Sequence, residues 1–188
     1  MSRRIGSWWI TDFVDGASFT AGRDGVAALV MSSHGSPSGF AVSDGYVSTD
    51  DAVDFGKSDL EVFASHACGL LEHTPDNSAG RWIPAFERLH YLLGFHDDSY
   101  YSGSSHDPRG SLPAAYSAWL HYSFFGAFDM PVREAWAEAN EIVESADVHW
   151  AYLRATSPEA DTYDERLQAG EPPAPAAGRT FYTARGTC

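Results

Sequence analysis

Two apolar runs of strand length constrain most strongly how this chain can fold. Residues 25–33 (GVAALVMSS) and 60–68 (LEVFASHAC) are apolar almost throughout and lack the alternation of a half-exposed strand. Such runs are typical of strands buried on both faces, as in parallel sheets. Each run ends in small residues beside one reactive side chain, which is His34 after the first run and Cys68 at the end of the second.

Weaker signals predict the remaining elements. We expect a short strand at 7–13, a hairpin around Asp44-Gly45, a short helix passing into a strand within 81–95, and a helix at 112–128. The clearest helix covers 129–146, with Asp129 as its cap and Pro131 in its first turn. One apolar stripe predicts the face of this helix that packs in the core: Val132, Ala135, Trp136, Ala139 and Val143.

Buried strands separated by helices predict an α/β protein, specifically a three-layer α/β/α sandwich with a mostly parallel sheet. Residues 1–155 form the predicted domain, and residues 156–188 form a C-terminal tail rich in Pro, Ala and Gly. Two outcomes stay open for this tail. It is a disordered end, or its Phe181 and Tyr182 dock the segment from Arg179 onto the body.

The charge restricts the partners. The chain has 26 acidic and 12 basic residues and a net charge of -14, which argues against nucleic acid and anionic membranes. This charge serves solubility, or it creates a field that favours cationic substrates. No apolar run approaches the roughly 20 residues of a membrane span, and no signal peptide is recognisable. Two cysteines are too few for a disulfide framework, so we expect a free thiol and a cytoplasmic protein. The oligomeric state stays open.

His34 and Cys68 form the strongest candidate site. In open α/β sheets, sites form beyond the carboxyl ends of the strands, so both side chains would project into one crevice if their strands are parallel neighbours. A thiol becomes a nucleophile when a nearby imidazole accepts its proton. The amides of Gly35 and Cys68 would then stabilise the oxyanion of a tetrahedral intermediate.

An apolar strand followed by His-Gly, and a second one followed by Ala-Cys, resemble the caspase–gingipain–legumain superfamily of cysteine peptidases. The spacing is similar to that of gingipains, and "SHACGLL" resembles the cysteine strand of the separase-related CHAT peptidases. The resemblance covers roughly residues 5–155, and more closely the chain resembles bacterial proteins of unassigned function that carry this fold. It implies a caspase-like fold in which His34 is the base and Cys68 the nucleophile.

Further residues are candidates around this pair. Asp12 either orients His34 or only solubilises a strand end. Asp97 and Asp98 follow the third apolar run, where the resemblance implies a specificity pocket, and acidic residues there would suit an Arg or Lys side chain. They are equally consistent with a solvated loop. The other candidates for substrate contact are His66, Tyr100 and Trp119.

A metal site is the alternative to a thiol dyad for these histidines and the cysteine. His34, His66, His73 and Cys68 are all of ligand type, but their spacing is irregular, so we predict no metal and no cofactor.

The predicted function is that of a Cys-His thiol hydrolase, with a peptide or amide bond as the default substrate. Two alternatives stay open. One is an enzyme that tailors a small molecule on the same fold, and the other is a non-catalytic binding module.

Overall fold

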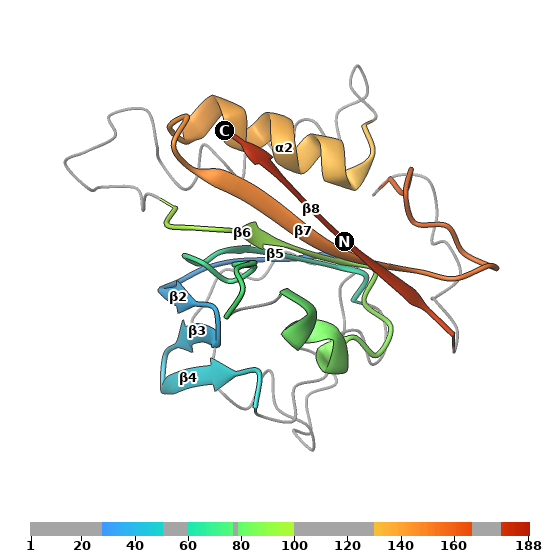
Figure 1. Cartoon of the computed structure of the whole chain (residues 1–188), viewed down its shortest axis with the longest axis horizontal. Coiled ribbons are helices and arrows are strands. Elements are labelled where there is room, and N and C mark those ends of the chain that lie inside the picture. The colour runs from blue at the N-terminus through green and yellow to red at the C-terminus, as the bar shows by residue number, and fades with distance from the viewer. Residues whose placement is uncertain (1–27, 51–59, 77–78, 100–129, 167–177) are drawn as a thin grey trace.

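A computed structural model of the chain describes residues 28–50, 60–76, 79–99, 130–166 and 178–188 (Figure 1). The elements in these ranges, in chain order, are β1 (Ala28–Ser32), β2 (Gly35–Ser36), β3 (Gly39–Val42), β4 (Gly45–Ser48), β5 (Val62–His66), the 3-10 helix η3 (Ala79–Ala85), β6 (Tyr91–Phe95), α2 (Val132–Val143), β7 (His149–Thr156) and β8 (Thr180–Thr187). The strand predicted at 7–13 and the helix predicted at 112–128 lie outside the described residues.

The main sheet has five strands in the order β1-β5-β6-β7-β8. Strands β1, β5 and β6 pair in parallel, whereas β7 is antiparallel to β6 and β8 is antiparallel to β7. The two apolar runs of the sequence are therefore adjacent parallel strands, which is the condition on which the candidate site depended. The predicted hairpin is also present: β3 and β4 pair up to Val42↔Gly45, and β2 joins them in a three-stranded antiparallel sheet.

The prediction of a three-layer α/β/α sandwich with a mostly parallel sheet is wrong. The described residues are mostly β, with a mixed five-stranded sheet, a separate three-stranded sheet and only two short helices, η3 and α2. Figure 1 shows α2 over one face of the main sheet, with η3 and the small sheet on the other side. The error has a physical cause. The apolar sequence of a strand indicates only that apolar groups cover both of its faces. Any apolar layer, whether of helices or of another sheet, can provide that cover.

Helix α2 packs its apolar stripe on one face of the sheet. Val132, Ala135, Trp136 and Ala139 are buried there, against residues of β5 and β6 such as Leu93. These four residues belong to the predicted stripe, and the side chain of its fifth member, Val143, lies outside the described part of the structure.

The cap of α2 differs from the prediction. The N-cap is Pro131, which makes no side-chain capping bond, and Asp129 lies outside the described residues. Deep burial of its apolar face is consequently the main stabilisation of this helix that the structure shows.

The opposite face is covered by aromatic side chains from the small sheet and from η3. Phe40 of β3 stacks on Trp82 of η3 at a centroid distance of 6.0 Å and meets Phe63 of β5 edge-on at 5.7 Å. The indole nitrogen of Trp82 donates a hydrogen bond of 2.9 Å to the Leu70 carbonyl oxygen, just beyond β5. These contacts hold the segment after β5 in position.

The C-terminal segment does not form a separate tail. Strand β8 pairs with β7 along its whole length, from Thr156↔Thr180 to His149↔Thr187. The predicted boundary between residues 155 and 156 therefore divides elements of one sheet. The predicted docking near Arg179 is present: Nη1 of Arg179 donates to the Glu87 carbonyl oxygen at 2.8 Å.

A helix that spans a membrane must be both long and apolar. Within the ranges that the structure describes, no helix has both the length and the apolar character needed to cross a bilayer.

Candidate functional site

The ends of β1 and β5 bring the predicted pair to the same level of the sheet. Ser32 and His66 are register partners, and the Ser33 amide continues the ladder by donating to the His66 carbonyl oxygen at 3.2 Å. His34 and Cys68 each follow that rung by two residues. The chain therefore presents the imidazole and the thiol just beyond the carboxyl ends of neighbouring parallel strands.

Gly35 lies against the segment that carries the thiol. A Cβ atom on Gly35 would lie 2.6 Å from the Ala67 Cβ and 2.8 Å from the Cys68 carbonyl oxygen, closer than real side chains come. Only glycine allows the two segments to approach this closely. The Ala41 amide donates to the His34 carbonyl oxygen, and this antiparallel pattern directs the Gly35 amide away from β3.

Cys68 lines a hollow of about 390 Å³ beyond the carboxyl ends of these strands. His34 is exposed beside the hollow and is not among its described lining residues. The lining combines small, polar and acidic groups: Gly35, Ser36, Pro37, Cys68, Gly69, Glu72, Thr74, His96, Asp97 and Asp98.

The Cys68 thiol is partly buried. Its Sγ donates to the Ser99 carbonyl oxygen at 3.4 Å. Burial raises the pKa of the thiol above its ordinary value, and the Asp98 carboxylate adds to the rise. The resting thiol is therefore neutral at physiological pH, and a nucleophilic role would need a base that removes its proton.

A buried polar chain lies beneath the thiol. Ser99 Oγ donates to Glu144 Oε1 at 3.0 Å, and the same oxygen lies 3.8 Å from Nδ1 of His66. The His66 ring packs edge-on against Phe95 and Trp136. Burial lowers the pKa of His66 to about 3, so burial outweighs the nearby carboxylate and the ring is neutral. His66, a predicted substrate contact, packs with the α2 side of the core and is not among the described residues that line the hollow.

The two acidic residues after β6 have different surroundings. Both carboxylate oxygens of Asp97 accept hydrogen bonds from His149, one from the backbone amide at 2.8 Å and one at Nδ1 at 2.7 Å. Asp98 is exposed and lines the hollow. Asp97 therefore anchors the start of β7, which leaves Asp98 as the better candidate for contact with a substrate.

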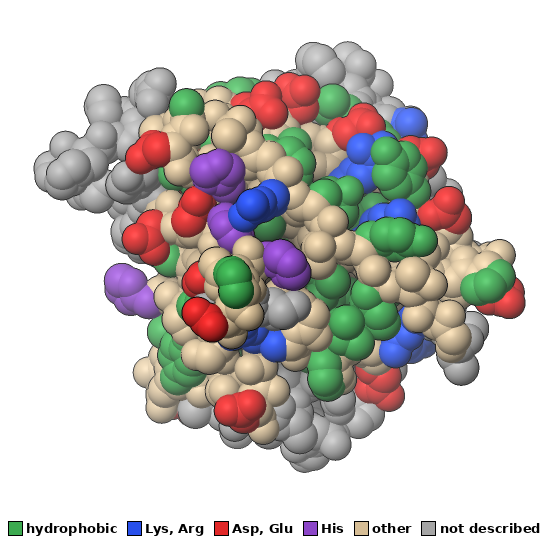
Figure 2. All heavy atoms as spheres, viewed as in Figure 1, with side chains coloured by type: hydrophobic (Ala, Val, Ile, Leu, Met, Phe, Trp, Pro, Cys, Tyr) green, Lys and Arg blue, Asp and Glu red, His purple; other side chains and the backbone are tan. Residues whose placement is uncertain are grey.

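His96 and Arg185 belong to the same region, and neither is among the site residues predicted from the sequence. Nδ1 of His96 accepts from the His73 amide at 3.0 Å, and its Nε2 faces the guanidinium of Arg185 on β8. Burial, followed by the positive charge of Arg185, lowers the pKa of His96. Figure 2 shows histidine side chains gathered around a basic side chain on this face. His96 could have been found from the sequence, because it directly follows a buried strand. No feature of the neighbouring sequence indicates that Arg185 belongs to this region.

Three predicted site residues, Asp12, Tyr100 and Trp119, lie outside the described residues. The alternative metal set also does not assemble, because His66 is buried in the core and His73 is exposed. Within the described ranges, metal-type ligands converge at a different place, formed by Glu61, His90 and Glu165.

Comparison with known proteins places the chain in a family. The model of a domain of unknown function, DUF6345, matches residues 6–186, and the chain therefore belongs to the DUF6345 family. No curated protein and no solved structure matches the chain.

Proposed function

We propose that the chain is a thiol hydrolase of the caspase–gingipain–legumain type. In this proposal Cys68 attacks a peptide or amide carbonyl and His34 acts as the base. The observation that carries the proposal is the shared level of the two residues, each two positions beyond the last common rung of β1 and β5. Access of Cys68 to the hollow supports it further.

The chemistry follows from these positions. His34 takes the proton of the neutral Cys68 thiol as Sγ bonds to the carbonyl carbon, and the electron pair of the C=O bond moves to oxygen. The amides of Gly35 and Cys68 donate to this oxyanion. Protonated His34 then gives its proton to the leaving amine, and the C–N bond breaks. Water hydrolyses the resulting thioester with His34 again as base, which restores the thiol.

The hollow favours a peptide as substrate over an enclosed small molecule. It is open to solvent, and its described lining is polar and acidic rather than a closed apolar chamber. Asp98 at its edge supports a preference for a cationic side chain next to the scissile bond. The acidic chain as a whole would reinforce that preference.

The first test measures thiol reactivity. In a Cys188→Ser background, iodoacetamide should label Cys68 with a rate that rises with pH to a midpoint above about 8.5, the ordinary thiol pKa, because burial disfavours the thiolate. His34→Ala should lower the rate several-fold at neutral pH, whereas the matched control His73→Ala, also an exposed histidine, should not. Equal rates in the two variants would show that His34 does not assist the thiol.

The second test measures turnover. Fluorogenic peptides with Arg, Lys, Asp or Leu before the scissile bond are the substrates. The peptides with Arg or Lys should be cleaved faster than those with Leu or Asp. Cys68→Ser should abolish cleavage, and Asp98→Asn should reduce the preference for Arg and Lys. Labelling that depends on His34 without cleavage of any peptide would contradict the peptide substrate and favour a small-molecule substrate. Labelling that is independent of His34 would favour a binding module.

A further inference from the structure

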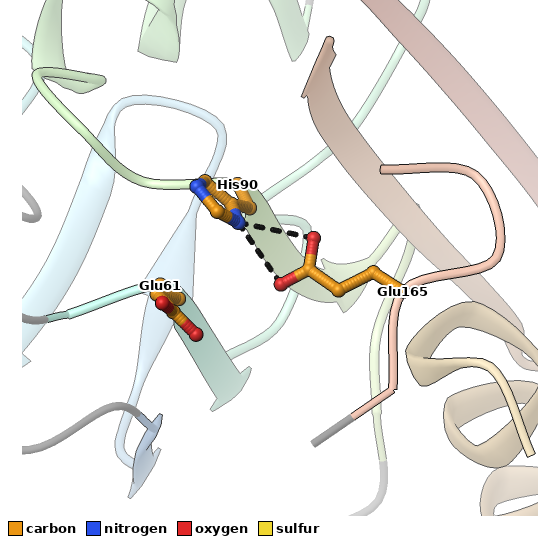
Figure 3. A group of neighbouring side chains, drawn as sticks. All are labelled: Glu61, His90 and Glu165. Carbon is orange, nitrogen blue, oxygen red and sulfur yellow. Dashed lines mark hydrogen bonds and ion pairs between the residues drawn. The ribbon is translucent and has the colours of Figure 1, made fainter. Parts of the chain in front are cut away.

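A cluster of metal-type ligands lies at the end of the sheet opposite the hollow. Glu61 directly precedes β5, His90 directly precedes β6, and Glu165 lies in the segment after β7. Figure 3 shows the Glu165 carboxylate directed at one edge of the His90 ring, with the Glu61 carboxylate below the same edge. One ligand atom from each of the three residues lies within 4.8 Å of the other two.

Burial distinguishes this cluster from acidic groups on the surface. The side chains of His90 and Glu165 are 1% and 3% exposed. Nδ1 of His90 lies 2.9 Å from Glu165 Oε1 and 3.0 Å from Oε2, so both oxygens face one ring nitrogen. The other nitrogen, Nε2, is buried and has no hydrogen-bond partner among the described residues. Nδ1 is therefore the polar contact through which this ring is held.

The donor atoms of the cluster are of the kind that bind a cation. Two carboxylates converge on one imidazole in a mostly buried place. Carboxylate oxygens and imidazole nitrogens are common ligands of divalent metal ions.

We propose that Glu61, His90 and Glu165 bind one divalent first-row transition ion, with Zn²⁺ and Mn²⁺ as the fitting candidates. Imidazole together with carboxylates suits these ions better than Ca²⁺ or Mg²⁺, which take oxygen ligands. Ligands bound at about 2.0–2.2 Å in a tetrahedral Zn²⁺ site lie about 3.3–3.6 Å apart, so ligand atoms within 4.8 Å of one another reach that geometry with shifts of up to about 1 Å. Glu61 is the least buried of the three ligands.

The role of this site is structural. The amides of His90 and Tyr91 donate to the Glu61 carbonyl oxygen, and the carbonyl oxygen of Glu165 accepts from the Val132 amide at the start of α2. An ion held by the three side chains would tie the starts of β5 and β6 to the segment that anchors α2. Because Cys68 lies at the other end of β5, metal binding should change stability and leave thiol reactivity unchanged.

The test uses the full, tag-free chain, stripped with a chelator and titrated with Mn²⁺ while electron paramagnetic resonance counts the free ion. We expect about one equivalent to bind, Zn²⁺ to displace it, and the thermal midpoint to rise with Mn²⁺ concentration. Glu61→Gln and Glu165→Gln should bind at least tenfold more weakly. Glu141→Gln, the same change at an exposed position on α2, should bind as the parent chain does.

Two results would overturn the proposal. One is a folded parent chain that binds no Mn²⁺, and the other is equal binding by Glu61→Gln and Glu141→Gln. Either result would identify His90 and Glu165 as a buried ion pair only. If Glu165→Gln does not fold, Glu61→Gln decides, because its side chain is only partly buried.

Discussion

Gly35 determines how closely the histidine segment approaches the cysteine segment. The space for a side chain there is already occupied by the Ala67 Cβ and by the Cys68 carbonyl oxygen. The second of these atoms is backbone, and the segment after β5 is held by the Trp82 hydrogen bond to Leu70, so neither neighbour can move away easily. Gly35 is therefore a positioning residue for His34 and Cys68 rather than a mere turn former.

Replacement of this glycine gives the prediction at the scale of the residue. Gly35→Ala should lower the free energy of unfolding by about 1–3 kcal/mol, because the added methyl overpacks the contact. It should also slow alkylation of Cys68 at neutral pH by moving His34 away. Urea unfolding and iodoacetamide labelling measure the two effects.

Gly94→Ala is the matched control, because a Cβ there meets Leu71 at an ordinary 3.5 Å. If Gly35→Ala behaved like Gly94→Ala in both measurements, the close approach at Gly35 would matter neither for stability nor for the reactivity of Cys68.

Strand β8 is the last strand at one edge of the main sheet and covers β7. Its residues are exposed or partly buried, whereas residues 151–155 of its neighbour β7 are all buried. Phe181 extends the contact beyond the ladder by meeting Phe86 edge-on at 5.5 Å. The last element of the chain thus covers an edge of β7 that would otherwise be free to pair with another molecule.

Deletion of this strand gives the prediction at the scale of the element. A chain that ends at Gly178 should lose at least about 3 kcal/mol of stability, since each net hydrogen bond contributes about 0.5–1.5 kcal/mol. It should also associate, because the β7 edge becomes exposed. Thermal unfolding and light scattering measure these effects.

A point variant separates the contribution of the Phe181 ring to stability from that of the whole strand. Phe181→Ala keeps the ladder and should cost only about 1–2 kcal/mol, since the ring is partly buried. A truncated chain with the parent's thermal midpoint that remained dispersed would show that β8 is dispensable.

Charge acts at the scale of the whole molecule. The chain carries a net charge of -14, and the described lining of its hollow includes three acidic residues, Glu72, Asp97 and Asp98. Like-signed charges on a chain and in its cleft add to one field, which concentrates cations near the opening. Arg185 and the neutral His96 provide only a local exception at one side.

Reaction with charged thiol reagents measures this field without assuming any enzymatic activity. In a Cys188→Ser background, a cationic methanethiosulfonate should modify Cys68 roughly tenfold faster than an anionic one at low salt. At 1 M salt the difference should nearly vanish, because the screening length falls to about 3 Å.

Two variants locate the source of the effect. Asp98→Asn should reduce the ratio of the two rates more than Glu141→Gln on α2, although both remove one charge. A ratio near one at low salt would mean that the reagents do not sense the acidic surface at Cys68.

The sequence by itself determined the elements whose signals are local. The continuous apolar runs identified β1 and β5, and the stripe through Trp136 identified the buried face of α2. The position of His34 and Cys68 after those runs was readable for the same reason. Strand period, helix period and strand ends are properties of neighbouring residues, so a single segment carries them.

Only the tertiary structure decided what covers the sheet and which distant side chains meet. The small sheet and η3, rather than a second layer of helices, fill one face, and the C-terminal segment became β8. His149 takes the Asp97 carboxylate, and Glu61, His90 and Glu165 converge although up to 104 positions separate them. Apolar burial is non-directional, and contacts between remote side chains depend on strand order and register, so neither leaves a periodic trace in the sequence.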